Sequence, residues 1–254
     1  MKRFFTSDFH LNSALINKYA ARPFRCAESA LNGLIENCNQ CAGEDDTVIH
    51  VGDFFLKGAD RHGESEDRSC GVPFKDCVSR IKAHLVLLSG NHDDGHNCDT
   101  IGRCLLINIS RHWRNVTVAH HPSYCKEYDG VYGRNGRFPH VHLCGHVHNS
   151  WLVLYDRQHN VLNVNVGVDA WNYKPVSDAE LVSLLDYLKE HADFVRSDIR
   201  MSRSEFDKFE ADTNRKRREE RKSRKAERHL KLGLTPEECE RRKLEALKRK
   251  GLVK

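Results

Sequence analysis

Residues 2–10 read KRFFTSDFH, a strand-forming run that ends in an aspartate and a histidine. Two similar runs follow, at residues 47–53 and 84–93, and each also ends in polar residues, Asp53 in the first and the segment GNHD in the second. Residues 24–41 and 73–82 separate the three runs and have the apolar spacing of helices. The first part of the chain therefore predicts a β-α-β-α-β series in a parallel or mixed sheet.

The second half has a different rhythm. Strand-forming runs come in close succession, at residues 104–109, 115–119, 141–144, 151–155 and 161–166. Such a succession favours a second, mostly antiparallel sheet. We expect an α/β fold in which two sheets pack face to face, with helices outside.

The C-terminal part is helical and basic. The segment SDAE at residues 177–180 is a capping box that begins an apolar-periodic helix. The periodicity ends near Met201, and residues 215–254 contain 17 Lys and Arg against 7 Asp and Glu, a net charge of +10 in a chain of net charge +5. We predict two parts, a domain at residues 1–195 and a basic helical or partly disordered tail at 196–254. A second capping box, TPEE at 235–238, predicts a short helix within the tail.

Several classes of protein are disfavoured by composition. No stretch approaches the ~18 apolar residues that span a bilayer, and Asp8 interrupts the only run that could serve as a signal peptide. We therefore predict a cytoplasmic protein without membrane association, whose ten cysteines are reduced thiols. Cys38 and Cys41 form a CxxC pair, but no second pair has the spacing of a zinc site.

Polar residues gather where the predicted strands end. They are Asp8, His10, Asp53, Asn91, His92, Asp93, His120, His121, His146 and His148. Side chains at the carboxyl ends of strands converge on one edge of an α/β sheet. Imidazole and carboxylate ligands suit two divalent cations, which Asp53 could bridge, and such a pair generates a bridging hydroxide nucleophile at neutral pH. Gly52, Gly90 and Gly145 are expected to serve tight backbone geometry.

Five motifs resemble those of the calcineurin-like metallophosphoesterases, in that family's order. They are Ser7-Asp8-Phe9-His10, Gly52-Asp53, Gly90-Asn91-His92-Asp93, His120 with Pro122, and Gly145-His146-Val147-His148. Three further segments, RPF at 22–24, DTV at 46–48 and GVDAWNYKPVS at 167–177, resemble a small bacterial and phage branch of the family. The resemblance extends from about Lys2 to His191 and leaves out the tail.

This resemblance implies a four-layer α/β/β/α sandwich with a dinuclear centre. The first metal would be held by Asp8, His10, Asp53 and His148, and the second by Asp53, Asn91, His120 and His146. His92 would act as general acid or stabilise the transition state, and Asp93 would orient His92. Mn²⁺ is the preferred cofactor, with iron, zinc and nickel as alternatives.

Some assignments stay open at the level of sequence. His121 is an alternative to His120 as the ligand. Arg22 could bind a substrate phosphate together with Asn91 and His92, or it could form an ion pair. Trp171, Asn172 and Tyr173 could support the metal site or pack at the edge of the fold. The histidines outside the motifs are expected to be structural: His50, His84, His112, His140 and His142.

Three functions follow from these residues. The first is a metal-dependent phosphoesterase, a phosphatase or phosphodiesterase acting on a small phosphorylated metabolite or nucleotide. The second is a nucleic-acid phosphodiesterase recruited through the basic residues of 215–250, although no aromatic residue follows Phe209 to stack on bases. The third is a non-catalytic scaffold on the same fold. Loops at 57–71 and 126–137 are expected to set specificity, and the oligomeric state is not predicted.

Overall fold

The computed structural model describes residues 1–56, 70–93, 100–122, 138–194 and 199–231, together with the single positions 245 and 248. The predicted specificity loops fall largely outside these ranges, as does the capping box at 235–238. The chain divides into two compact units, Met1–Arg203 and Ser204–Lys254. The first unit ends after Arg203, not after residue 195, because β10 (Arg200–Met201) pairs with β7 (Val153–Asp156).

The first sheet has four strands. Its order is β3 (His84–Leu88), β2 (Thr47–Val51), β1 (Arg3–Thr6) and β9 (Val176–Ser177). The first three strands are parallel, and β9 runs antiparallel to β1, so the sheet is mixed. The three predicted strand runs of the first half therefore lie side by side and end at the same edge.

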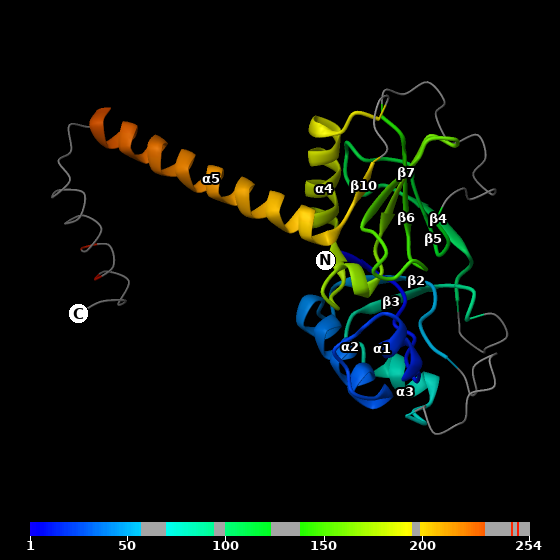
Figure 1. Cartoon of the computed structure of the whole chain (residues 1–254). Helices are drawn as coiled ribbons and strands as arrows, with labels where there is room; N and C mark the ends of the chain where they lie inside the picture. Colours follow the sequence, from blue (N-terminus) through cyan, green and yellow to red (C-terminus); the bar gives the residue numbers. More distant parts are fainter. Residues whose placement is uncertain are drawn as a thin grey trace. The chain divides into compact units, whose positions relative to one another are not determined.

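Two of the three N-terminal helices match the predicted helical runs: α2 (Ala27–Cys41) and α3 (Phe74–Ser79). The buried residues of α2 recur at helical spacing. Leu31, Leu34, Ile35 and Cys38 pack with Phe4, Val48 and Leu87 from the first sheet in one apolar core. Helix α1 (Leu15–Tyr19) was not predicted, since five residues are too few to establish a helical period. Figure 1 shows these helices gathered beside β2 and β3.

The second sheet has six strands in the order β10-β7-β8-β6-β5-β4. All five predicted strands form, and those not yet given are β4 (Cys104–Ile107), β5 (Val116–Ala119), β6 (His140–Cys144) and β8 (Val161–Asn165). Three of the pairings are antiparallel, but the central pairings β5–β6 and β6–β8 are parallel. The expected mostly antiparallel sheet is thus a mixed one, because β6 pairs with β8 instead of with β7, its neighbour in sequence.

The capping box at 177–180 begins α4 (Asp178–His191), as predicted. Ser177 Oγ accepts a hydrogen bond from the Glu180 backbone N–H at 3.3 Å, and Glu180 Oε2 accepts one from the Ser177 backbone N–H at 2.8 Å. The helix buries Leu181, Leu184, Leu185 and Leu188 and contacts β9 and β1 of the first sheet; Figure 1 shows it in yellow. The sequence after β10 forms the helix α5 (Arg203–Lys231). Among the described residues, no helix combines the length and the apolar character that crossing a bilayer requires.

Candidate metal centre

The loops that follow β1 and β2 are held together by backbone hydrogen bonds. Asp8 N–H donates to Gly52 O at 3.1 Å, and His10 N–H donates to Asp53 O at 2.9 Å. The end of β1 also meets the loop after β8, because Ser7 forms a β-bridge with Gly167 and its carbonyl accepts from Val168 N–H at 3.1 Å. The ends of strands from both sheets therefore meet at one place.

Several residues in these loops have a left-handed backbone conformation. Five residues predicted as ligands have positive φ angles: Asp8 at 61°, His10 at 46°, Asp53 at 56°, His146 at 71° and His148 at 50°. A non-glycine residue in such a conformation costs about 1–3 kcal/mol, and such residues cluster at functional sites. Five of the residues that the sequence motifs single out thus have strained backbone.

Two glycines permit the loops to approach closely. A Cβ atom at Gly145 would collide with the side chains of Ser7 and Asp8, and one at Gly90 would collide with the Asp53 carboxylate. Both positions therefore require glycine for close packing around the carboxylates, as expected from the sequence.

Each of the four ligands predicted for the second metal has a donor atom about 3 Å from that of at least one other. Asn91 Oδ1 lies 3.0 Å from His120 Nε2 and 3.1 Å from His146 Nδ1. His120 Nε2 also lies 3.1 Å from Asp53 Oδ2. Neighbouring ligands of an octahedral cation with bonds near 2.1 Å are separated by about 3 Å. The observed spacing therefore fits a set of ligands for one cation.

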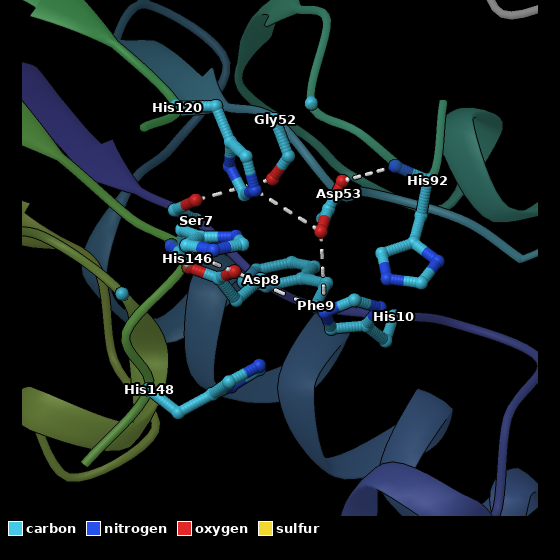
Figure 2. A network of polar contacts seen from close by, with 12 residues as sticks. Ser7, Asp8, Phe9, His10, Gly52, Asp53, His92, His120, His146 and His148 are labelled. Atoms are coloured by element: carbon cyan, nitrogen blue, oxygen red, sulfur yellow. Dashed lines mark hydrogen bonds and ion pairs between the residues drawn. The ribbon is translucent and has the colours of Figure 1, made fainter. Parts of the chain in front are cut away.

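A second group of donor atoms comes from Asp8, His10 and His148, all within 4.8 Å of one another. His10 Nε2 is buried, has no hydrogen-bond partner, and lies 3.8 Å from Asp8 Oδ1 and 3.6 Å from Asp53 Oδ2. Leaving a buried nitrogen without a partner costs about 1–3 kcal/mol. A cation between His10 and the two carboxylates would supply the missing partner, so these residues fit a metal. Figure 2 shows Asp8, His10, Asp53 and His120 directed toward this common space.

The two carboxylates at the centre differ in their surroundings. Burial tends to raise the pKa of Asp53, but the hydrogen bond from His120 and the charges of His120 and His10 outweigh it and hold that pKa below its usual range. Burial is the main reason that the pKa of Asp8 is raised. Burial also lowers the pKa of His10 well below its ordinary value, so His10 is neutral, the form in which imidazole binds metals.

Hydrogen bonds orient two of the histidines. His120 donates from Nδ1 to the Val51 carbonyl at 2.9 Å, and His148 donates from Nδ1 to Asp169 Oδ2 at 2.8 Å. Such contacts fix the tautomer of metal-binding histidines and leave Nε2 for the metal. His120 is also buried, whereas the His121 side chain is exposed. The structure therefore favours His120 over His121 as the ligand.

Asp93 does not have the contacts that were expected of it. Its carboxylate accepts backbone N–H bonds from Asp53 at 2.6 Å, Gly90 at 2.8 Å and Phe54 at 3.2 Å. Asp93 thus ties the loop of Asp53 to its own loop, and its observed role is to hold backbone rather than to orient the His92 ring. His92 is placed through its own backbone N–H, which donates to Asp53 Oδ1 at 2.8 Å.

Arg22 forms an ion pair, which is one of the two alternatives that the sequence allowed, and its guanidinium is not exposed to a substrate phosphate. Its side chain is 0% exposed, and Nε lies 2.7 Å from Asp169 Oδ1. Its remaining nitrogens donate to the carbonyls of Asp8 and Phe9. With its planar fork occupied by Asp169 and the two carbonyls, the guanidinium favours the ion-pair alternative over the binding of a substrate phosphate. Asp169 was missed because its only sequence signal was its place in the segment at 167–177.

Most of the remaining open residues pack within the fold. Trp171 is buried, and its Nε1 donates to Asn165 O at 2.7 Å. His50 and His142 are buried in the interior, and burial lowers their pKa values to about 3 and about 4. These positions agree with the structural roles expected for them.

Comparison with models of known protein families gives no match for this chain. The chain is 26% identical to an uncharacterized protein, MJ1445, of Methanocaldococcus jannaschii over 189 residues, which cover 73% of this chain and 92% of the relative. It is also similar to the crystal structure of the protein of unknown function AQ665 from Aquifex aeolicus, with a TM-score of 0.50 at 18% identity over 72% of this chain and 98% of that one. The second comparison indicates a shared fold.

Proposed function

We propose that this chain is a metal-dependent phosphoesterase of the calcineurin-like class, with a four-layer α/β/β/α arrangement of its sheets and helices. One observation carries the proposal. Ligand-type side chains from five separate loops converge, and within this cluster His10 Nε2 is buried without a partner beside two carboxylates. Asp8, His10, Asp53 and His148 would hold one divalent cation, and Asp53, Asn91, His120 and His146 a second, with Mn²⁺ preferred.

Divalent cations bound here would place positive charge beside phosphoryl oxygens and make water more acidic. The chain supplies the rest of the chemistry. Asp53 lies within 3.6 Å of His10 and 3.1 Å of His120, one residue from each ligand group, and its charge would offset part of the repulsion between two bound cations. His92 is half-buried beside His10, with ring centroids 5.1 Å apart, and can donate a proton to the leaving oxygen. Asn91 and His92 would contact the phosphate of the substrate.

The proposal is tested by assaying the chelator-treated protein with and without added Mn²⁺. The substrate panel contains phosphomonoesters, cyclic nucleotides, dinucleotides and single-stranded nucleic acids. We expect hydrolysis of at least one class that depends on Mn²⁺ and a metal content of two per chain. Equal activity before and after metal removal would exclude the proposal. An inactive protein that still binds two metals would favour the non-catalytic scaffold.

His92→Ala tests the general acid. The variant should slow hydrolysis of an alkyl phosphate by about 10²–10⁴-fold, the usual contribution of a positioned acid. Hydrolysis of an aryl ester with a good leaving group should fall much less, because that leaving group needs no proton. Metal content should be unchanged. The matched control is His84→Ala, since His84 is exposed on β3; full activity of His92→Ala on the alkyl ester would contradict the assignment.

A second candidate function is a nucleic-acid phosphodiesterase that binds its polymer through α5. Arg215, Arg218, Arg221 and Lys222 are exposed, and their spacing of three and four residues places them along one side of the helix. A row of cations along an exposed helix suits the phosphate backbone of a nucleic acid.

Charge reversal separates this function from the first. The triple variant Arg218→Glu, Arg221→Glu and Lys222→Glu should weaken binding of single-stranded DNA. The slope of the logarithm of the binding constant against the logarithm of salt concentration should become less steep by about 0.7 for each phosphate that is no longer neutralised. Hydrolysis of a small ester should not change. The opposite control is Glu219→Lys with Glu220→Lys, both exposed on the same helix, which should strengthen binding. Unchanged polymer binding in the triple variant would remove nucleic acid as a partner of α5.

A further inference from the structure

A buried ion pair contacts residues of the candidate metal centre. Arg22 and Asp169 have side chains that are 0% and 1% exposed. They are joined by two parallel contacts, from Arg22 Nε to Asp169 Oδ1 at 2.7 Å and from Arg22 Nη2 to Asp169 Oδ2 at 2.9 Å. Removing two charges from water is costly, and a buried pair is weak evidence of a gain in stability. The contacts that this pair makes beyond itself therefore decide its role.

The first external contact is to a ligand. Asp169 Oδ2 accepts a hydrogen bond from His148 Nδ1 at 2.8 Å. This bond places the proton on Nδ1 and turns Nε2 toward Asp8 and His10, with which His148 forms one ligand group. The His148 and His10 rings lie 5.3 Å apart. Asp169 thus sets both the tautomer and the orientation of His148.

The second external contact is to the backbone of the other ligands. Arg22 Nη2 donates to the Asp8 carbonyl at 2.6 Å, and Nη1 donates to the Phe9 carbonyl at 3.0 Å. Asp8 and His10, on either side of Phe9, both have positive φ angles. Strained backbone persists only where its surroundings hold it in place. Arg22 supplies such a restraint at the segment that carries two ligands.

We propose that Arg22 and Asp169 form one positioning unit for the metal position of Asp8, His10 and His148. The unit fixes a histidine through the carboxylate and a strained backbone segment through the guanidinium. Its hydrogen bonds reach this ligand group and not Asn91, His120 or His146, all of which the structure describes, so its influence is selective for one of the two cations. This inference rests on the proposed metal centre.

The test is a calorimetric titration of the chelator-treated full chain with Mn²⁺, which measures the number of binding sites and the affinity of each. The wild-type protein should show two sites. Asp169→Asn keeps the size of the side chain but removes its charge and should weaken one site by about 10–100-fold, the usual effect of losing a partner of a metal-binding histidine. The other site should change less than threefold. The matched control is Asp156→Asn, because Asp156 pairs with His159 at 2.7 Å on the surface of the protein.

Arg22→Lys provides a second route, since it keeps the positive charge but lacks the fork that reaches both carbonyls. It should weaken the same site. It also replaces Asp169→Asn as the deciding variant if that protein does not fold, as judged by circular dichroism. A wild-type chain that binds no Mn²⁺ would refute the proposed metal centre itself. Two wild-type sites that the variants leave unchanged, or weaken equally, would overturn the inference while leaving the metal centre intact.

Discussion

Asp53→Asn is expected to abolish activity and to lower the affinity of the protein for both cations. Asp53 is the carboxylate common to both ligand groups, with Oδ2 3.1 Å from His120 Nε2 and 3.6 Å from His10 Nε2. Asparagine keeps the shape but removes the negative charge that two neighbouring cations require. Because losing a partner of a ligand already costs about 10–100-fold, losing this shared ligand should reduce activity by more than about 10³-fold.

The measurement is metal content by elemental analysis, together with turnover of the best substrate in the panel. Asp45→Asn is the matched control, because Asp45 is an exposed aspartate at the surface before β2. The variant should remain folded, because asparagine has nearly the same size and shape as aspartate. Asp53→Asn with two bound metals and near-normal turnover would show that Asp53 does not bridge the cations.

His120→Ala and His121→Ala should differ sharply although the residues are adjacent. The Nε2 atom of His120 lies 3.0 Å from Asn91 Oδ1 and 3.1 Å from Asp53 Oδ2. The pKa of His120 is raised to about 9, because its hydrogen bond with Asp53 and the charges of Asp8 and Asp53 outweigh burial. Removing this imidazole would take away one of the four proposed ligands of the second cation and should reduce activity by more than about 100-fold.

His121 makes a weaker contribution. Its exposed ring lies against His146, with ring centroids 4.3 Å apart, and its carbonyl accepts from His142 Nε2 at 2.9 Å, a contact that alanine keeps. His121→Ala should change turnover by no more than about threefold, equivalent to less than about 1 kcal/mol. Metal analysis and steady-state kinetics of both variants check this. A larger loss of metal in His121→Ala than in His120→Ala would reassign the ligand.

The strands and the main helices could be predicted because their signals are local. Residues 47–51 and 84–88 are short apolar runs that end in turn-forming polar residues, and α2 repeats its apolar side chains at helical spacing. The capping box of Ser177 and Glu180 is contained within four residues. The gathering of polar residues at strand ends could be predicted for a similar reason, since parallel strands end at a common edge.

The partners of particular side chains could not be predicted in this way. Asp93 was expected to act on its neighbour His92, but its carboxylate accepts from the backbone of Asp53 in another loop. Arg22 had two plausible uses, and only its burial against Asp169, far away in the sequence, decided between them. Pairing of β6 with β8 likewise depends on which strands meet in space rather than on their order along the chain.

The sequence by itself therefore determined the elements of this protein and the residue types offered at the ends of its strands. Those properties follow from the side chains within one run of residues, through apolar periodicity and turn chemistry. The tertiary structure alone decided which nitrogen of His148 faces the cluster, which groups occupy the guanidinium of Arg22, and that His10 Nε2 is left buried without a partner. These depend on ångström-scale distances between loops that are remote in sequence, because hydrogen bonds form only at short range and in narrow geometries.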